Sequence, residues 1–281
     1  MPVHQPSTAV LFPGQGSHVD GMGDMVASAD PQLHARCLKL VGDDAFARAG
    51  EDTRFAQPAI FCASLAGAIH ETIAEPAVYA GHSLGELTAL TAAGVFTVDD
   101  GLALVVERGR LMALAAADQG DGGMTVLLKA DAEQAQAIAE THGVVVANDN
   151  APGQIVLSGS RPALDAAAQD AKDQGLRAMS LDVAGAFHSP AMAAAADGFT
   201  KALADIELHD AKVPVVSCAT TRPFEDIRAE LAAALTAPVR WRQTLLALQE
   251  TGVTRFVDAG PGAILAGTVK RTIGEPASAH A

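Results

Sequence analysis

The sequence predicts an α/β protein, with a parallel sheet covered by helices on both faces and a small inserted subdomain. Short apolar segments alternate with glycine-containing loops and helical patterns through most of the chain, as in parallel sheets. Residues 122–185 instead follow the order strand, helix, strand, strand, helix, strand, which is the ferredoxin-like βαββαβ arrangement. At 281 residues and 49% hydrophobic, the chain can bury a full core. We therefore expect a core formed by 1–121 and 186–281, with 122–185 as the subdomain.

The first part of the core begins with an apolar strand at 8–12, which stops at the loop Pro13-Gly14-Gln15-Gly16. A glutamine between two glycines offers an amide and bare backbone N–H groups at the carboxyl end of a strand, where α/β proteins bind ligands. A second strand is expected from Val78. Apolar periodicity predicts helices at 31–41, 58–74, 85–93 and 98–116. The helix at 58–74 would begin with Pro58, a residue favoured at the first helical position.

The subdomain and the second part of the core are predicted by the same periodicities. The subdomain strands are expected at 124–129, 143–147, 154–158 and 176–183, and its helices at 132–141 and 161–174. The elements expected after Pro190 are an Ala-rich helix, a strand at 213–217, helices at 225–234 and up to 250, a strand at 254–258 and a final helix. Glycines at 120, 122, 123 and 185 mark where the chain enters and leaves the subdomain.

The segment 78–90 has the pattern of a nucleophile elbow. A short strand leads into Gly81-His82-Ser83-Leu84-Gly85, a Gly-x-Ser-x-Gly turn, and a helical run follows. The glycines permit a sharp turn that exposes the Ser83 hydroxyl at the start of the helix. The amides there, led by that of Leu84, can hold a developing oxyanion. Ser83 is therefore the candidate nucleophile.

Arg108 lies on the apolar face of its expected helix. Leu104 and Val105 precede it by four and three residues, and Leu111 and Met112 follow it by three and four. Two interpretations are open on this spacing. The guanidinium is either buried and satisfied by a structural carboxylate or helix-end carbonyls, or it receives an anionic ligand bidentately.

His188 is the candidate base for Ser83, because it follows an expected strand and precedes the Ser189-Pro190 helix start. His82 neighbours Ser83, but successive residues of an extended segment point to opposite sides, which makes it a poor base. His18 follows the Gln15 loop and is a second candidate.

Composition excludes several classes of partner and site. A net charge of −14 argues against nucleic acid and anionic membrane surfaces. The three cysteines, Cys37, Cys62 and Cys218, lack the spacing of a metal site and are typical of a reducing compartment. No signal-peptide pattern is visible, and the apolar runs are too short to cross a membrane. We expect a cytoplasmic monomer with no metal.

Several short motifs are spread in order over the whole chain. They are Phe12–Ser17, Gly81–Glu86, Glu107–Met112, Asn148–Gln154, Gly185–Ser189, Ala237–Trp241 and Ala259–Gly262. Together they resemble the malonyl-CoA:acyl carrier protein transacylase family and the related acyltransferase domains of polyketide synthases. The resemblance implies an α/β-hydrolase-like core that carries the ferredoxin-like subdomain, with the active site between them.

The resemblance also implies an activity and roles for the reacting groups. Malonyl-CoA would donate a malonyl group to Ser83, and the phosphopantetheine thiol of an acyl carrier protein would then receive it, with no permanently bound cofactor. His188 would be the base, with Gln15 beside the oxyanion and the amide of Leu84 as a donor to it. Fatty acid and polyketide synthesis are both compatible with this reaction.

Further roles follow for the residues around the acyl group. Arg108 would pair with the free malonyl carboxylate, and Asn150, from the Asn148–Gln154 motif, would bind substrate. Phe187 before His188 accompanies malonyl rather than methylmalonyl use in the polyketide branch. The family often carries glutamine at the position of Ala234, where its main-chain carbonyl orients the histidine. The replacement leaves the mechanism intact if the carbonyl suffices, but alters local geometry if the glutamine side chain is needed.

Two other functions use the same residues. A thioesterase or acyl hydrolase would use the Ser-His dyad with water as acceptor, and the malonyl-transfer subunit of malonate decarboxylase would use a different carrier. An acidic carrier protein would be repelled by the overall charge, so docking would need a local basic patch. The candidates for that patch are Arg240, Arg242, Lys270 and Arg271.

Overall fold

The computed structural model describes residues 7–70 and 76–274. The first of its two sheets is parallel and has the strand order β7-β2-β1-β8. Its strands are β1 (Thr8–Phe12), β2 (Val78–Gly81), β7 (Val215–Val216) and β8 (Arg255–Asp258). Phe12 pairs in register with Gly81, so the loops that follow β1 and β2 start side by side. These are the Gln15 loop and the segment that carries Ser83.

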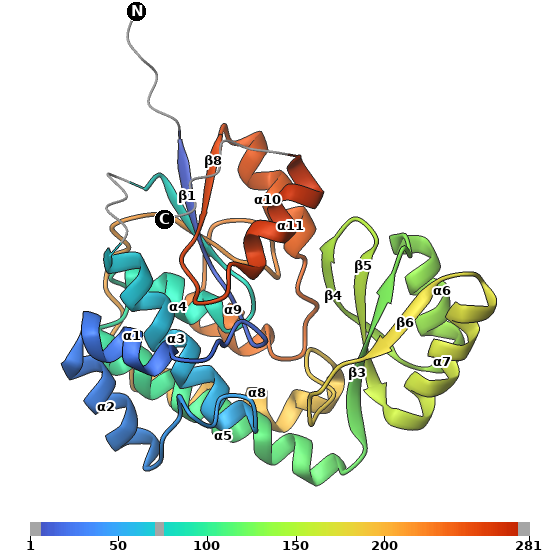
Figure 1. Ribbon diagram of the computed structural model, residues 1–281, viewed down its shortest axis with the longest axis horizontal. Helices are drawn as coiled ribbons and strands as arrows, with labels where there is room; N and C mark the ends of the chain where they lie inside the picture. The colour runs from blue at the N-terminus through green and yellow to red at the C-terminus, as the bar shows by residue number, and fades with distance from the viewer. Residues whose placement is uncertain (1–6, 71–75, 275–281) are drawn as a thin grey trace, which may run out of the picture.

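Alternate residues of β1 face two separate apolar layers, because successive side chains of a strand point to opposite faces. Val10 and Phe12 belong to the larger cluster, whereas Ala9 and Leu11 belong to the second cluster with Trp241. The helices around this sheet are α1 (Met22–Ala29), α2 (Pro31–Val41), α3 (Thr53–His70), α4 (Gly85–Ala92), α5 (Val98–Gln119), α8 (Ala193–Ala204), α9 (Ile227–Ala233), α10 (Trp241–Glu250) and α11 (Ile264–Ile273). A 3₁₀ turn, η1 (Pro190–Met192), precedes α8. Both faces of the sheet are thereby covered (Figure 1).

The second sheet is antiparallel and has the order β4-β5-β3-β6. It lies beside the parallel sheet and its helices (Figure 1). Its elements are β3 (Gly122–Leu128), α6 (Ala132–His142), β4 (Val145–Ala151), β5 (Gln154–Ser160), α7 (Arg161–Asp173) and β6 (Arg177–Ser180). Leu127, Ile155 and Leu157 form a cluster with the two helices. Val126 and Val156, from the opposite face, join the large cluster of the parallel-sheet part. The predicted fold class, a parallel α/β core with a ferredoxin-like subdomain, is confirmed.

Backbone hydrogen bonds tie β4 of the antiparallel sheet to the segment before α10. The Val239 N–H donates to the carbonyl of Ala147 at 2.8 Å, and the Asp149 N–H donates to the carbonyl of Val239 at 2.9 Å. In addition, the Arg242 side chain on α10 donates hydrogen bonds to the Asp149 carboxylate from Nε (2.9 and 3.0 Å) and from Nη2 (2.7 Å). We call Asp149, Val239 and Arg242 the β4 clamp. The clamp positions Asn150, which is the residue after Asp149 on β4.

The first helices differ from the sequence prediction in two respects. Helix α1 was not predicted, because it has only 8 residues and its N-cap, Gly21, supplies no side-chain hydrogen bond. Helix α3 begins at Thr53 rather than Pro58, because the Asp52 carboxylate accepts from the Arg54 N–H at 2.8 Å and acts as the start signal. Pro58 lies inside the helix, where its missing N–H removes only one backbone bond. The predicted end of this helix at 74 lies outside the described residues.

Elsewhere the predicted strands and helices are found within a few residues, apart from the strand predicted at 213–217. That strand is reduced to Val215–Val216. Within 7–70 and 76–274, no helix combines the length and the hydropathy that a membrane span requires.

Candidate active site

The turn between β2 and α4 packs so closely that its glycines admit no side chain. A Cβ on Gly81 would lie 2.0 Å from the Gly85 carbonyl carbon, and one on Gly85 would lie 1.9 Å from the Phe12 carbonyl oxygen. Between them Ser83 has φ +53°, in the left-handed region that few non-glycine residues adopt. The Ser83 hydroxyl therefore stands out from a sharp turn at the start of α4, as the elbow pattern predicts.

Ser83 and His188, which are 105 residues apart, are in direct contact. Ser83 Oγ lies 2.8 Å from His188 Nε2. His188 Nδ1 lies 3.0 Å from the Ala234 carbonyl and 3.1 Å from the Ala237 carbonyl. Because carbonyls only accept, Nδ1 carries the proton and Nε2 is left to accept from the serine hydroxyl. The replacement at Ala234 thus leaves the backbone contact in place, and among the described residues two carbonyls rather than a carboxylate orient the ring.

The His188 ring is neutral at physiological pH. Burial, the positive charge of Arg108 and the neighbouring His82 together lower its pKa to about 3. A neutral imidazole with a free Nε2 lone pair is the state that a general base requires. His82, in contrast, donates from Nε2 to the Asn150 Oδ1 at 2.8 Å, and His18 lies in the wall of the adjoining cavity.

Arg108 is 4% exposed, and its guanidinium contacts the dyad directly. Nη2 donates to Ser83 Oγ at 3.2 Å, and Nη1 donates to Gln57 Oε1 at 2.7 Å. In the described part of the chain, no carboxylate forms an ion pair with Arg108. Burial lowers its pKa to about 10, a value at which the guanidinium is still charged at neutral pH. A buried cation beside the candidate nucleophile, with no ion-pair partner among the described residues, is suited to an anionic ligand.

Gln57 and Thr53 extend this contact into a chain of hydrogen bonds that the sequence analysis missed. Gln57 Nε2 donates to Thr53 Oγ1 at 2.8 Å, and the Thr53 hydroxyl donates to Gln15 Oε1 at 2.6 Å. Their spacing of four residues puts both on one face of α3. The four-residue spacing is visible in the sequence, but a helix predicted to start at Pro58 contains neither residue.

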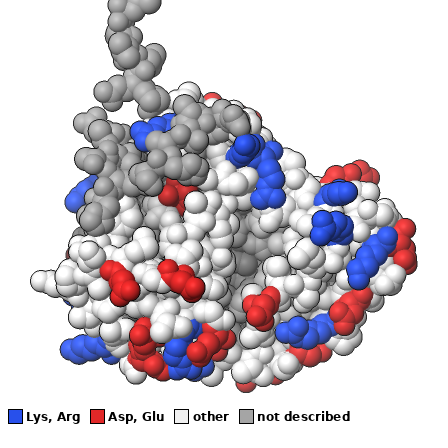
Figure 2. All heavy atoms as spheres, in the orientation of Figure 1, with Lys and Arg blue, Asp and Glu red and all other residues white. Residues whose placement is uncertain are grey.

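The other predicted binding residues line a cavity of ≈ 690 Å³ between the two sheets. Gln15, His82, Asn150 and Phe187 are in its wall, so the residues directly before Ser83 and His188 both face it. Figure 2 shows the hollow between the two parts of the molecule. The side chain of Leu84 is fully buried, but its N–H lies at the first turn of α4, ahead of the helix's internal hydrogen bonds.

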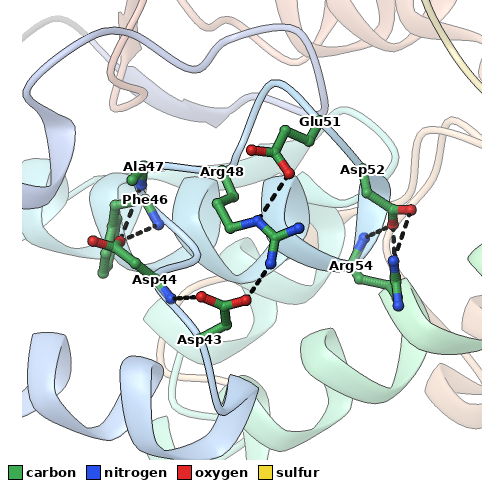
Figure 3. A network of polar contacts seen from close by, with 8 residues as sticks. All are labelled: Asp43, Asp44, Phe46, Ala47, Arg48, Glu51, Asp52 and Arg54. Atoms are coloured by element: carbon green, nitrogen blue, oxygen red, sulfur yellow. Dashed lines mark hydrogen bonds and ion pairs between the residues drawn. The ribbon is translucent and has the colours of Figure 1, made fainter.

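The loop before α3 forms one rim of the cavity, and ion pairs between its own side chains hold it together (Figure 3). Arg48 pairs with Asp43 and with Glu51, the latter at 2.8 Å, and Arg54 pairs with Asp52 at 3.0 Å. Arg48 also stacks over the Phe55 ring, 4.1 Å from its centroid. These exposed pairs add little stability individually, but they order the loop that leads into α3, where Thr53 contacts Gln15.

The proposed basic patch is only partly accessible. Arg242 belongs to the β4 clamp and is paired with Asp149, whereas Arg240 is exposed. Arg271 on α11 is exposed and lines the cavity. Figure 2 shows Lys and Arg side chains at the upper end of the hollow, where Figure 1 places α11.

Comparison with known proteins agrees with this geometry. Residues 10–281 match the family described as the acyl transferase domain. The chain belongs to this family. The malonyl CoA-acyl carrier protein transacylase of Synechocystis sp. is 37% identical over 279 residues, which are 94% of this chain and 93% of that protein. The transacylase of Bacillus subtilis is 36% identical over 94% of this chain and 89% of its own length.

Solved structures of family members have the same fold. The malonyl-CoA:acyl carrier protein transacylase of Xanthomonas oryzae pv. oryzae superposes with a TM-score of 0.88 at 36% identity, over 95% of this chain and 92% of that one. A malonyl-transacylase in complex with a type II polyketide synthase acyl carrier protein gives 0.89 at 33% identity, over 97% and 94%. The resemblance predicted from the motifs is therefore confirmed along nearly the whole chain.

Proposed function

We propose that this protein transfers a malonyl group from malonyl-CoA to the phosphopantetheine thiol of an acyl carrier protein. The observation that carries the proposal is Arg108, a buried guanidinium 3.2 Å from the Ser83 hydroxyl with a neutral hydrogen-bond partner. A malonyl thioester is an acyl group with a free carboxylate at its far end, and it supplies the missing anion. The family and its relatives support the same reaction.

The first half-reaction acylates the serine. Ser83 Oγ attacks the thioester carbonyl while His188 Nε2 takes the hydroxyl proton. The tetrahedral oxyanion is held by the N–H of Leu84 at the start of α4, beside the Gln15 loop. The carbon–sulfur bond then breaks, and the proton on His188 goes to the departing thiolate of coenzyme A.

The second half-reaction runs in the reverse sense with a different thiol. His188 takes the proton of the phosphopantetheine thiol, whose sulfur attacks the malonyl-serine carbonyl. The ester bond breaks and the proton returns to Ser83 Oγ. The Ala234 and Ala237 carbonyls hold the ring in one tautomer throughout, because both accept from Nδ1–H.

The acyl group is selected by residues that do not react. Arg108 orients the malonyl carboxylate, and Asn150 binds substrate from the β4 side of the cavity. Phe187, 6% exposed and in the cavity wall, narrows the space beside the α-carbon and favours malonyl over methylmalonyl. The functional unit is a monomer with its core in 1–121 and 186–281 and its subdomain in 122–185. Arg240 and Arg271 offer local positive charge to an acidic carrier.

A mass measurement tests the proposal. Purified protein incubated with malonyl-CoA should gain one malonyl group on Ser83, and adding a phosphopantetheinylated carrier should remove it and give malonyl-carrier. The Ser83→Ala variant should gain nothing. Arg108→Ala should lower malonyl loading roughly tenfold or more while acetyl loading changes far less, because a charge-assisted hydrogen bond contributes about 1.5–3 kcal/mol.

Three results would contradict the proposal. Absence of any adduct on the wild-type protein would exclude the malonyl-serine intermediate. Rapid release of free malonate, at a rate that the carrier does not alter, would identify an acyl hydrolase instead. Transfer to a malonate decarboxylase carrier in preference to an acyl carrier protein would assign the same chemistry to that complex.

A further inference from the structure

Gln57 connects the guanidinium of Arg108 to the wall of the cavity. Its side chain is fully buried on α3, and its amide makes contacts on both sides. Oε1 accepts from Arg108 Nη1 at 2.7 Å, while Nε2 donates to Thr53 Oγ1 at 2.8 Å and lies 3.4 Å from Gln15 Oε1. It therefore touches both the predicted carboxylate receptor and the loop beside the oxyanion.

The orientation of this amide is dictated by its neighbours. A guanidinium can only donate, so the atom facing Arg108 has to be the carbonyl oxygen. The amine end then faces the oxygens of Thr53 and Gln15 and the sulfur of Met112, which lies 3.2 Å away. The Thr53 hydroxyl in turn donates to Gln15 Oε1 at 2.6 Å, so each group in the chain of hydrogen bonds has one compatible donor or acceptor role.

The chemistry at position 57 decides whether the charge of Arg108 is available. Arginine side chains in protein interiors are usually matched by a carboxylate, which forms a bidentate pair and cancels the charge. Here the acceptor is neutral. The buried carboxylate of Glu86 is engaged by the Cys218 N–H at 2.7 Å and acts on Arg108 only through space. The amide thus aims the guanidinium toward Ser83 without neutralising it.

We propose that Gln57 is a positioning residue that sets acyl specificity, because its neutral amide holds Arg108 in place and leaves the positive charge for the substrate carboxylate. The inference rests on the proposed malonyl transfer. It predicts that a carboxylate at the same position would act as an internal substitute for the malonyl carboxylate. The free protein would then be stable, but selective against acyl groups that carry a charge.

The test compares malonyl-CoA with acetyl-CoA in the Gln57→Glu variant, which keeps the size of the side chain. The ratio of kcat/KM for the two thioesters should fall about ten- to hundredfold, because the new carboxylate competes for charge-assisted hydrogen bonds to Arg108. Acetyl loading should change by less than about threefold. Gln249→Glu on the exposed end of α10 makes the same chemical change and should leave the ratio unaltered.

A second variant separates charge from packing. Gln57→Met is neutral and similar in size but lacks the acceptor, so Arg108 loses an anchor and keeps its charge. The ratio should then fall about fivefold, the effect of one ordinary hydrogen bond. A purely structural role for Gln57 would instead lower malonyl and acetyl loading by the same factor in both variants, and that result would overturn the proposal.

Thr53→Val keeps the test decisive if Gln57→Glu does not fold. Without the Thr53 oxygen, the Gln57 amine loses its 2.8 Å acceptor, so the amide that holds Arg108 Nη1 is fixed less firmly. The malonyl-to-acetyl ratio should fall two- to fivefold in this variant, and an unchanged ratio would contradict the inference. A wild-type protein that fails to load malonyl refutes the proposed function itself, whereas wild-type loading with an unchanged ratio in the variants refutes only the role of Gln57.

Discussion

The side chains of His188 and Glu86 are both buried, and burial moves their pKa values in opposite directions. It lowers the pKa of the His188 imidazole to about 3 and raises the pKa of the Glu86 carboxyl to about 7, because each charged form loses its solvation. Their ordinary values are 6.5 and 4.5. Between those two pH values the residues therefore have opposite effects on the free energy of unfolding.

Whether each residue stabilises or destabilises the fold as pH changes depends on whether the folded or the unfolded state binds its proton. As pH falls from 6.5 to 4.5, the unfolded chain protonates His188 while the folded protein does not, so His188 destabilises the fold. Over the same range the folded protein protonates Glu86 while the unfolded chain does not, so Glu86 stabilises it. Each effect is at most about 1.4 kcal/mol per pH unit.

We predict that Glu86→Gln makes the free energy of unfolding fall more steeply with decreasing pH than in the wild type, and that His188→Gln does the reverse. Urea unfolding at intervals between pH 4.5 and 6.5 measures both slopes. Variant curves that run parallel to the wild-type curve would show that neither residue titrates differently on folding.

At the scale of single elements, the elbow depends on the absence of a side chain at two glycines. Because a Cβ on Gly85 would meet the Phe12 carbonyl oxygen at 1.9 Å, the turn has to move away from β1 to admit it. We predict that Gly85→Ala lowers the free energy of unfolding by at least about 2 kcal/mol and reduces malonyl loading of Ser83. Thermal unfolding and the adduct assay measure the two effects.

Gly267 is the matched control for that substitution. It also lies in a helix, α11, but a Cβ there would meet no atom within 4 Å. Gly267→Ala should be neutral or stabilise the protein by up to about 1 kcal/mol, the difference in helix propensity. Equal effects at the two positions would mean that close packing of the elbow is not the cause.

At the scale of the whole molecule, the β4 clamp joins the antiparallel sheet to α10 and the segment before it. Asp149 and Arg242 form its charged part, with side chains 10% and 30% exposed. We predict that Arg242→Ala costs about 2–3 kcal/mol of unfolding free energy, because it leaves a mostly buried carboxylate without its cationic partner and with only the neutral Gln243 side chain donating to it at 2.7 Å. It should also raise KM for malonyl-CoA and acetyl-CoA alike, since Asn150 follows Asp149 on the strand that the clamp holds.

Arg110→Ala provides the comparison for the clamp. Arg110 pairs with Glu107 at 2.6 Å, but the two side chains are 51% and 34% exposed. Such surface pairs contribute about 0–1 kcal/mol, so this variant should have little effect on unfolding or on KM. A similar loss of stability in both variants, measured by urea unfolding, would show that the β4 clamp is no stronger than a surface pair.

Local patterns in the sequence determined most of the elements and several of the residues discussed here. Alternating and helical periodicities and turn motifs depend on neighbours within a few positions. The sequence alone therefore predicts the strand at 8–12, the elbow around Ser83 and the βαββαβ order. The start of α3 could not be located from Pro58, because the Asp52 cap begins the helix five residues earlier, and a helix that starts at Pro58 does not contain Thr53 and Gln57.

Only the tertiary structure decided which distant groups meet. Ser83 contacts His188 across 105 residues, and the Ala234 carbonyl reaches the same ring from another segment. The two interpretations of Arg108 could not be separated by spacing, because the distinction lies in whether a carboxylate from elsewhere in the chain approaches the guanidinium. The structure places the neutral amide of Gln57 there instead. Side-chain periodicity reports the face on which a residue lies, whereas its partner depends on how the sheet and helices pack, and packing joins segments that no local pattern relates.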